Sequence, residues 1–440
     1  MQPIAGQKFH IAGVAGVGMS ALAEALLDAG ALVSGSDRRL DNHDTSPVVD
    51  KLVAQGLTTF RQDGSAITPD LAALVVSSAI EETNAEVLAA RRWEIPIRHR
   101  AAVLAALTSA SPQRNLIAVA GTSGKSTTTA ILGAILTGCG LDPLVINGAP
   151  VIDWRDERRC GSVRNGQGDW CVIEVDESDR SLLHFHPRHA IITNASADHF
   201  PLPETLELFA AFRSQVSGIV IDGIADDTPA PPGEPLAWGS RFRWQSQDYA
   251  VALPGRHNVV NAWQAVRLAL ALGLPAAQIA AALSAFKGVE RRLELVGWRL
   301  QTIPVIDDYA HNTEKLRAVW QTLAAGHRRV LGLWRPHGYG PLRAMLDELG
   351  EMFAATLRPD DILYLLPVYD AGGTANRSID SGALAERLHA AGTKVVEVAS
   401  HQAAISQMTA TARAGDILAT LGARDPELPR TARKLAATQT

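Results

Sequence analysis

Short apolar runs alternate along this chain with longer stretches in which hydrophobic positions recur every three or four residues. Residues 8–37 contain an apolar run, a glycine turn, an alanine- and leucine-rich stretch and a second apolar run that ends at Asp37. This order indicates a βαβ unit. We expect further strands within 71–80 and 94–100, and helices within 86–93 and 101–110.

The same alternation continues to the end of the sequence. Apolar runs at 115–120, 170–175 and 189–194 predict strands, and helices are expected at 126–140, 258–273 and 276–286, with a proline-rich surface loop at 226–235. A third group of strands is expected at 303–310, 328–334, 361–368 and 394–399. Serine, proline and asparagine cluster at 109–115, which marks a linker. Strands that alternate with helices in this way predict three consecutive α/β domains.

Composition narrows the class of protein. Of the 440 residues, 47% are hydrophobic and 20% are charged, which is ordinary for a globular protein, and the net charge of -5 argues against a nucleic-acid or membrane partner. The three cysteines have no metal-ligand spacing and are too few for a disulfide scaffold. No apolar run reaches the roughly 18 residues of a membrane span, and the first residues lack the order of a signal peptide. We therefore expect a cytoplasmic enzyme.

A glycine-rich segment between a predicted strand and a predicted helix carries the strongest chemical signal. It consists of Gly121, Thr122, Ser123, Gly124, Lys125, Ser126 and Thr127. Such a loop directs backbone N–H groups at phosphate oxygens, with the lysine on the β- and γ-phosphates and the serine hydroxyl on Mg²⁺. The usual pattern has glycine where Val119 stands, so a purely structural turn is the alternative.

A second glycine turn lies near the N-terminus. Gly13, Gly16 and Gly18 follow the first predicted strand, and Asp37 ends the next one, near the place of a ribose-binding carboxylate. The glycine order differs from the usual dinucleotide fingerprint. We favour a diphosphate-containing ligand other than NAD; NAD itself and close packing without a ligand stay open.

Polar residues follow several predicted strands. Glu174, Asp176, Glu177 and Asp179 end the strand at 170–175, and Asn194, Asp198 and His199 follow the next one. Carboxylates at strand ends beside a phosphate loop are typical of Mg²⁺ sites, although a solvated acidic turn and a structural histidine are the alternatives.

Other candidates lie further along the chain. Asn258 and Asn261 could bind an adenine edge or cap a helix. Arg291 and Arg292 could bind phosphate or lie on the surface. Asp307, Asp308, His311, His337 and Tyr339 follow strands of the third domain.

These motifs, in this order and over nearly the whole chain, resemble those of the Mur ligase family. The matching segments include "AVAGTSGKSTTTA", "EVDESD", "TNASADH", "PGRHNVVNA", "GVERRLELVG", "DDYAH" and "RPHGY". The resemblance implies an α/β enzyme of three domains: a Rossmann-like domain for a UDP-sugar (1–108), a P-loop domain with a mostly parallel sheet for ATP (109–294) and a Rossmann-like domain for the amino acid (295–440). ATP phosphorylates the substrate carboxylate, and an amine then displaces phosphate from the acyl phosphate.

The resemblance also implies roles for individual residues. Lys125 would hold phosphates, Ser126, Glu174 and His199 would hold Mg²⁺, and Glu177 is the second choice for the metal. Asn258 and Asn261 would bind adenine, Arg292 a phosphate and Asp308 the ribose of ATP, with His311 beside the reacting centre. In the first domain the UDP-sugar would lie against Gly13, Gly16, Gly18, Met19, Ser20, Asp37, Ser77 and Ser78.

Some positions depart from the family pattern. Ser123 stands where members that add L-alanine carry histidine, and Asn312 and Thr313 replace a histidine and a proline. Gly338 and Pro341 replace two arginines that serve the amino-acid side of the reaction. Some family members use a carbamylated lysine in the central domain. This chain has no lysine between Lys125 and Lys287, so no residue there could take that role.

The implied function is therefore ATP-dependent amide formation between an amino acid or short peptide and a UDP-N-acetylmuramate-type acid. L-Alanine addition in peptidoglycan precursor synthesis is the favoured reaction, by a monomer or homodimer. The alternatives are a related ligase for another acid or amino acid, and a non-catalytic UDP-sugar-binding regulator.

Overall fold

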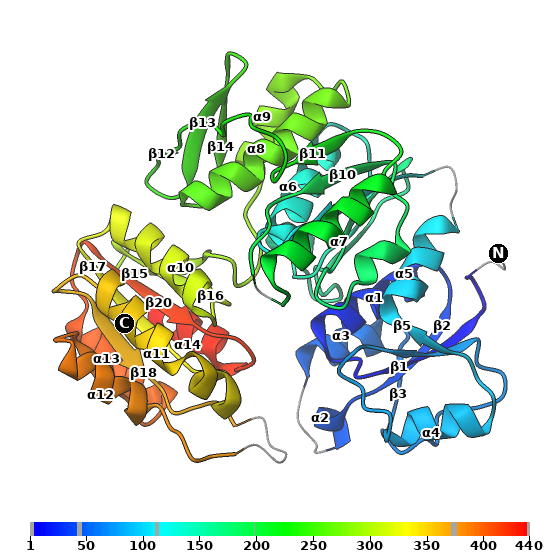
Figure 1. The fold of residues 1–440 in the computed structure, drawn as a ribbon, viewed down its shortest axis with the longest axis horizontal. Coiled ribbons are helices and arrows are strands. Elements are labelled where there is room, and N and C mark those ends of the chain that lie inside the picture. Colours follow the sequence, from blue (N-terminus) through cyan, green and yellow to red (C-terminus); the bar gives the residue numbers. More distant parts are fainter. Residues whose placement is uncertain (1–3, 42–45, 111–113, 198, 371–375, 438–440) are drawn as a thin grey trace. The chain divides into compact units, whose positions relative to one another are not determined.

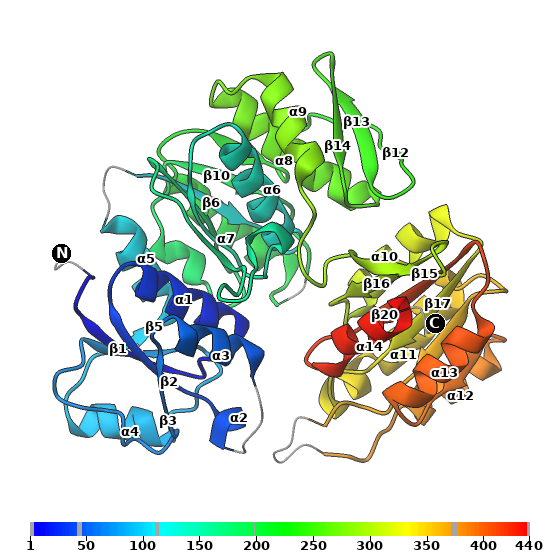
Figure 2. The same ribbon diagram turned by 180° about the vertical axis from the view of Figure 1, so that it is seen from behind.

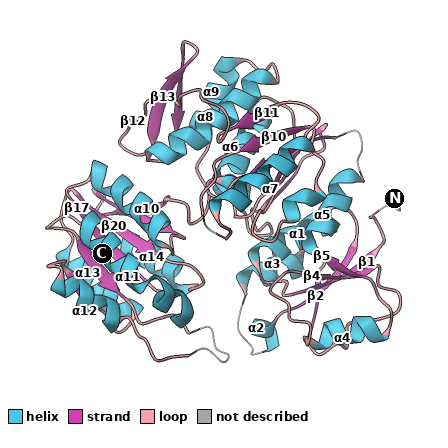
Figure 3. Cartoon of the chain, viewed as in Figure 1, coloured by secondary structure: helices cyan, strands magenta, loops and turns pink. Residues whose placement is uncertain are grey.

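The computed structural model describes residues 4–41, 46–110, 114–197, 199–370 and 376–437. Within these residues, helices alternate with strands that form three large sheets and one small sheet (Figures 1 and 3). The expected α/β fold class with three domains is confirmed. No helix in the described ranges is long and apolar enough to cross a membrane.

The first sheet is a five-stranded parallel sheet with the order β3-β2-β1-β4-β5. Its strands are β1 (Lys8–Ala12), β2 (Leu32–Ser36), β3 (Thr58–Phe60), β4 (Ala73–Val76) and β5 (Ile97–His99), and its helices are α1 (Val17–Asp28), α2 (Arg38–Asp41), α3 (Pro47–Ala54), α4 (Ala85–Arg92) and α5 (Arg100–Ser109). Apolar residues of α1, α3 and α5 pack on one face of the sheet, and those of α4 pack on the other.

The second sheet has six strands in the order β11-β10-β6-β9-β7-β8, parallel except where β8 joins the edge. Its elements are β6 (Asn115–Ala120), α6 (Lys125–Gly138), β7 (Leu144–Ile146), a 3-10 turn (Ile152–Trp154), β8 (Val163–Asn165), β9 (Trp170–Glu174), a second 3-10 turn (Ser181–His184), β10 (His189–Ile192), α7 (Leu202–Ser214) and β11 (Val220–Asp222). A small sheet of β12 (Glu234–Pro235), β13 (Ser240–Trp244) and β14 (Gln247–Val251) comes next in sequence, followed by α8 (Arg256–Ala271) and α9 (Ala276–Ala285).

The third sheet has six strands in the order β15-β16-β20-β17-β18-β19, and only β15 runs antiparallel to its neighbour. The strands are β15 (Glu294–Arg299), β16 (Ile303–Asp308), β17 (Arg329–Trp334), β18 (Ile362–Leu365), β19 (Val395–Glu397) and β20 (Asp416–Leu421), and the helices are α10 (Thr313–Gly326), α11 (Tyr339–Thr356), α12 (Gly382–Ala390), α13 (His401–Thr411) and α14 (Glu427–Ala436). Apolar residues of α10, α11 and α12 cover one face, and those of α13 and α14 cover the other (Figure 2).

The chain divides into two compact units: the first holds the N-terminal and central sheets, and the second holds residues 290–440. Within the first unit, one continuous apolar cluster runs from the N-terminal sheet into the central one. The domain boundaries expected after residues 108 and 294 stay a prediction.

A polar contact also joins the two sheets of the first unit. Arg159, on the segment before β8, forms ion pairs with Asp28 at 2.6 Å and with the buried Glu24 at 3.4 Å, both on α1. Nζ of Lys51 on α3 donates hydrogen bonds to the backbone carbonyls of Asp156 and Arg159 at 2.6 and 3.0 Å. We call these five residues the Arg159 clasp. It anchors the central domain's segment 156–159 on two helices of the N-terminal domain.

Candidate active site

The glycine-rich segment forms the tight connection between β6 and α6. Gly121 and Gly124 have φ angles of +133° and +82°, in the region that only glycine adopts readily. A Cβ atom on Gly124 would lie 2.4 Å from Oδ1 of Asn261, so the backbone also needs glycine for space. The N–H groups of the first turn of α6 have no helical acceptor, and they point out of the end of the helix that carries the positive dipole. This geometry fits a phosphate-binding loop.

Two residues at the end of β10, the strand beside β6, hold the loop in place. Oδ1 of Asn194 accepts hydrogen bonds from the Thr122 hydroxyl at 2.8 Å and from the Ser123 N–H at 3.0 Å, while Nδ2 donates to the Ser123 carbonyl. The Thr193 hydroxyl donates to the same carbonyl at 2.7 Å. The loop is thus shaped by its neighbouring strand, and the first-turn amides of α6 are left for a phosphate.

Lys125 lies among acidic side chains. Its ammonium donates to Oε2 of Glu177 at 2.6 Å and to the Gly121 carbonyl at 2.8 Å. Burial alone would lower the pKa of Lys125, but the charges of Glu177, Glu174 and Asp176 outweigh burial and raise it. Burial raises the pKa of Glu177, and Lys125 opposes that shift. The lysine is therefore a fixed cation at the mouth of the loop.

The residues around Lys125 fit Mg²⁺ by their donor chemistry. Oε1 of Glu177 is buried without a hydrogen-bond partner in the described chain, and the Ser126 hydroxyl lies in the first turn of α6. Glu174 accepts a hydrogen bond from the Gly148 N–H at 2.8 Å. Among the described residues, no group of three or more His, Cys, Asp or Glu side chains is arranged to bind a metal. Mg²⁺ takes one or two carboxylates and completes its shell with phosphate oxygens and water, so the free oxygen of Glu177 and the Ser126 hydroxyl are donors of the right kind.

The other residues of the central domain that were predicted to bind adenine or the metal lie on two further segments. Asn258 and Asn261 are buried inside α8, and Nδ2 of Asn261 donates to Oδ1 of Asn258 at 3.3 Å. Because Asn261 packs on Gly124, this part of α8 lies against the phosphate loop. His199 is exposed on the segment after β10, and Asp198 lies outside the described residues. The predicted roles of these side chains in adenine and metal binding stay predictions.

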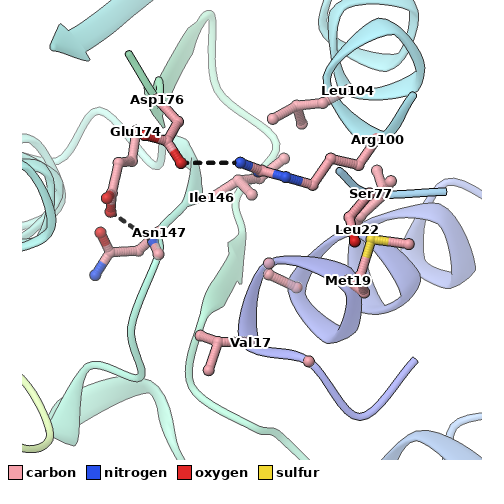
Figure 4. A pocket seen from close by; sticks show the side chains of 14 residues that line it. Val17, Met19, Leu22, Ser77, Arg100, Leu104, Ile146, Asn147, Glu174 and Asp176 are labelled. Atoms are coloured by element: carbon pink, nitrogen blue, oxygen red, sulfur yellow. Dashed lines mark hydrogen bonds and ion pairs between the residues drawn. The ribbon is translucent and has the colours of Figure 1, made fainter. Parts of the chain in front are cut away.

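A pocket of about 300 Å³ opens in the first unit beside Glu174 (Figure 4). Its walls include Gly16, Gly18, Met19 and Ser77, four of the residues predicted to face a UDP-sugar. The opposite wall comes from the central domain at residues 146–148, 174 and 176. The N-terminal glycine turn and the end of β9 therefore face one cavity.

Sequence reasoning missed Arg100, which crosses this pocket. It begins α5, its guanidinium donates to Oδ2 of Asp176 at 3.2 Å, and a Cβ atom on Gly18 would lie 3.3 Å from its Nη1. Burial alone would raise the pKa of Asp176, but Lys125, the hydrogen bonds from Ser178 and Arg100 together outweigh burial and lower it. No sequence motif distinguishes this arginine from the many others; only the fold brings it to the glycine turn.

The other predicted UDP-sugar residues do not line the pocket. Gly13, with φ of +75°, turns the chain after β1, and Oδ2 of Asp37 accepts a hydrogen bond from the Ala15 N–H at 3.1 Å. The Ser20 hydroxyl donates to the Val17 carbonyl, and Ser78 is exposed. Asp37 therefore shapes the glycine turn itself. The predicted contacts of Asp37, Gly13, Ser20 and Ser78 with a ligand stay predictions.

In the second unit, the predicted residues gather at the end of β16. Oδ1 and Oδ2 of Asp308 each accept a backbone N–H at 2.7 Å, from Ala310 and Leu293, and burial raises its pKa. Arg292 lies over the Tyr309 ring at 5.5 Å. His311 donates through Nδ1 to the Tyr309 carbonyl at 2.9 Å, because a carbonyl can only accept.

His337, which follows β17, packs edge-on against His311 with the ring centroids 5.0 Å apart. Burial, with His311 and Arg424, lowers the pKa of His337 to about 4, so its imidazole is neutral at physiological pH. In the second unit, two adjacent imidazoles and an arginine stacked on Tyr309 therefore lie near the carboxyl ends of the strands.

Comparison with known proteins decides the family. The family model described as "Mur ligase family, catalytic domain" matches residues 8–112, and "Mur ligase, glutamate ligase domain" matches residues 291–424. The chain is 34% identical to UDP-N-acetylmuramate–L-alanine ligase of Gloeobacter violaceus, over 96% of this chain and 94% of that protein. It belongs to the Mur ligase family. The prediction of a Mur-type ATP-dependent ligase is thereby confirmed.

Solved Mur ligases share the fold. UDP-N-acetylmuramate–alanine ligase of Thermotoga maritima superposes with a TM-score of 0.77 at 23% identity, over 97% of this chain and 98% of that one. A murein peptide ligase of Psychrobacter arcticus gives a TM-score of 0.60 at 22% identity, over 99% of this chain and 100% of that one. At these identities the similarity supports the three-domain Mur ligase architecture alone.

Proposed function

We propose that this Mur ligase joins L-alanine to the carboxylate of UDP-N-acetylmuramate and consumes ATP to ADP and phosphate. The observation that carries the proposal is the agreement among relatives. Several proteins named UDP-N-acetylmuramate–L-alanine ligase are 31–35% identical to this chain over 94–96% of its length. The phosphate loop and the adjoining pocket give that chemistry a physical basis.

The chemistry requires an activated acid, because a carboxylate is a poor electrophile. The substrate carboxylate attacks the γ-phosphorus and the bond to ADP breaks; the amine then attacks the acyl carbon, phosphate leaves and a proton is lost. Lys125 and the first-turn amides of α6 would stabilise negative charge on the transferring phosphoryl group. Its neighbours Glu177, Glu174 and Asp176 keep Lys125 protonated.

Mg²⁺ is part of the proposal. Ser126 and the carboxylates of Glu174 and Glu177 would hold it, with His199 as a further ligand, and bound Mg²⁺ would neutralise charge on the phosphates. The Glu177 oxygen without a partner supports this assignment. Asn258 and Asn261 would bind adenine, and Asp308 the ribose.

The pocket beside Glu174 would take the UDP-sugar. The backbone at Gly16 and Gly18 allows close approach of a diphosphate, and Arg100 supplies a guanidinium on the same wall. Since Glu174 belongs both to this pocket and to the charged surroundings of Lys125, the acid and the γ-phosphate would meet there. His311 and Arg292 of the second unit would lie beside the reacting centre and a phosphate, respectively.

The test is phosphate release from ATP, Mg²⁺ and UDP-N-acetylmuramate with each amino acid in turn, followed by mass spectrometry of the product. L-Alanine should give the largest kcat/KM and a product heavier than the acid by one alanine residue. Absence of phosphate release with every amino acid and short peptide would contradict the proposal.

A second candidate is a Mur ligase for a different amino acid, peptide or acid. It rests on Gly338 and Pro341, which stand where the family resemblance leads us to expect arginines on the amino-acid side. The same product masses separate it from L-alanine addition. A cytoplasmic location and a monomer or homodimer complete the proposal.

A further inference from the structure

A second cavity lies in the central domain where the strands of the sheet begin, at the end opposite the phosphate loop. It measures about 510 Å³, and its walls include Arg114, Asn115, His186, Arg188, His189 and Ser217. These residues precede or begin β6, β10 and β11, three neighbouring parallel strands. Their amino ends therefore meet at one place. We call this cavity the basic pocket.

Both side chains of the basic pocket that are always charged are cations. Two guanidinium groups line it together with two imidazoles, and no lining residue is a carboxylate. Nη1 of Arg188 donates to Oδ1 of Asn115 at 2.8 Å, and Nη2 of Arg114 donates to the Gly166 carbonyl at 3.0 Å. Both arginines are thus held by neutral acceptors. Asp142 senses the charge of Arg114 but forms its ion pair with Arg164, at 2.7 Å.

His189 adds a directed donor. The Ile219 N–H donates to its Nδ1 at 3.0 Å, so the neutral ring carries its proton on Nε2. Among the described residues, no acceptor takes that N–H. Burial, helped by Arg188, lowers the pKa of His189, which favours the neutral ring whose Nδ1 accepts from Ile219. The Ser217 hydroxyl, on the exposed segment before β11, adds a further polar group.

We propose that the basic pocket binds a phosphorylated small molecule at a site separate from the phosphate loop. Two arginine forks and an imidazole N–H match the oxygens of a phosphate monoester. The volume exceeds that of a phosphate ion and lies within the range of small-molecule sites, so the organic part of the ligand has room. The site is independent of the proposed ligase reaction, because no residue of its walls takes part in that reaction.

Isothermal titration calorimetry of the full chain tests the site, with uridine monophosphate and inorganic phosphate as separate probes at constant ionic strength. Ser217→Asp places a carboxylate among the lining residues at an exposed position, and Ser284→Asp adds the same charge on α9 outside the basic pocket. We expect Ser217→Asp to weaken nucleotide binding at least tenfold, about 1.4 kcal/mol, and Ser284→Asp to leave it within twofold of the native chain. Arg188→Gln should weaken it in the same way.

All variants keep the phosphate loop and the UDP-sugar pocket, and saturating ADP and UDP-N-acetylmuramate in every titration occupy those sites, so the heat of binding reports on the basic pocket. Equal affinities for the native chain, Ser217→Asp and Ser284→Asp would overturn the proposal, as would the absence of saturable binding in the native chain. Equal affinity for phosphate and uridine monophosphate would overturn the assignment to a phosphorylated organic molecule. Thermal unfolding of each variant separates lost binding from lost folding.

Discussion

Nζ of Lys125 lies 2.6 Å from Oε2 of Glu177, and the two side chains are only 14% and 2% exposed. The pair joins the first residue of α6 to the acidic segment after β9, so the cation is set in position by a second element of the central domain. A buried ion pair contributes little net stability, but breaking it by removing one partner is costly. The contact therefore fixes the position of the Lys125 ammonium more than it stabilises the fold.

Replacing Lys125 with alanine should lower kcat/KM for ATP by far more than tenfold, that is, by more than about 1.4 kcal/mol of barrier. The variant should also be less stable, because Glu177 keeps its burial and loses its cation. Steady-state phosphate release and thermal unfolding measure the two effects.

The double variant Lys125→Ala/Glu177→Gln separates these causes. The neutral amide removes the buried charge, so stability should recover while activity stays lost. Lys394→Ala, which breaks an exposed pair with Asp360, is the matched control and should change neither quantity. Lys125→Ala turning over within tenfold of the native rate would show that the lysine does not act on phosphate.

Replacing Asn194 with alanine should raise the KM for ATP about tenfold. The change removes three side-chain hydrogen bonds to Thr122 and Ser123 at once, and these bonds hold the loop in its phosphate-binding shape. Asn165→Ala, at an exposed position on β8, serves as the control. An unchanged KM for ATP would mean that the loop keeps its shape without the hydrogen bonds of Asn194.

Replacing Arg100 with alanine should weaken UDP-sugar binding about tenfold and leave the KM for ATP nearly unchanged. The variant removes the guanidinium beside Gly18 and leaves Asp176 without its partner, so negative charge in the pocket would repel a diphosphate. Arg98→Ala, on an exposed position of β5 two residues earlier, should have little effect. Equal effects of the two variants on the KM for the UDP-sugar would argue against the proposal that the UDP-sugar binds in the pocket beside Glu174.

Replacing Arg159 with alanine should destabilise the protein by about 2 kcal/mol at pH 8, and less at pH 5. Burial raises the pKa of Glu24, and Arg159 opposes that shift, so the variant raises the pKa further. A carboxyl group whose folded pKa exceeds its unfolded pKa favours folding at low pH and loses that contribution as pH rises through the folded pKa. Denaturant unfolding at the two pH values measures the difference.

The adjacent Arg158, exposed and without an ion pair among the described residues, provides the control for that experiment: Arg158→Ala should leave stability unchanged at both pH values. A penalty for Arg159→Ala that is larger at pH 5 than at pH 8 would contradict the assigned role of Glu24.

Much of the fold could be predicted because helical and strand periodicities are local. The runs at 115–120, 170–175 and 189–194 are β6, β9 and β10. The strands that the prediction missed include β15, β20, the hairpin of β13 and β14, and the short strands β3, β7, β8, β11 and β12. β20 is the last strand of the chain but lies between β16 and β17, so its identity depends on partners far away in the sequence. In the hairpin, buried and more exposed positions alternate over only five residues in each strand, and the sequence of β14 (QDYAV) does not alternate polar with apolar residues.

The candidate site shows the same limit. The spacing of the glycines and Lys125 predicted a phosphate-binding loop, and the structure has the expected strand, tight turn and helix because these elements are consecutive in sequence. The roles of Asn194 and Arg100 depend on which strands are neighbours and on how two domains pack, which spacing does not encode. Sequence comparison favoured Glu174 for the metal, whereas the residue that contacts Lys125 is Glu177.

The Arg159 clasp and the shared apolar cluster bear on how the pocket beside Glu174, proposed above for the UDP-sugar, is assembled. One wall of that pocket belongs to the N-terminal sheet and the other to the central sheet, and the clasp ties these sheets together at α1, the helix that carries Met19 and Leu22 of the first wall. The two walls are therefore brought together when the chain folds, before any ligand arrives, and a ligand has less conformational freedom to remove from the protein. Arg159, which lines neither wall of the pocket, is therefore expected to influence substrate affinity through the way in which the two walls meet.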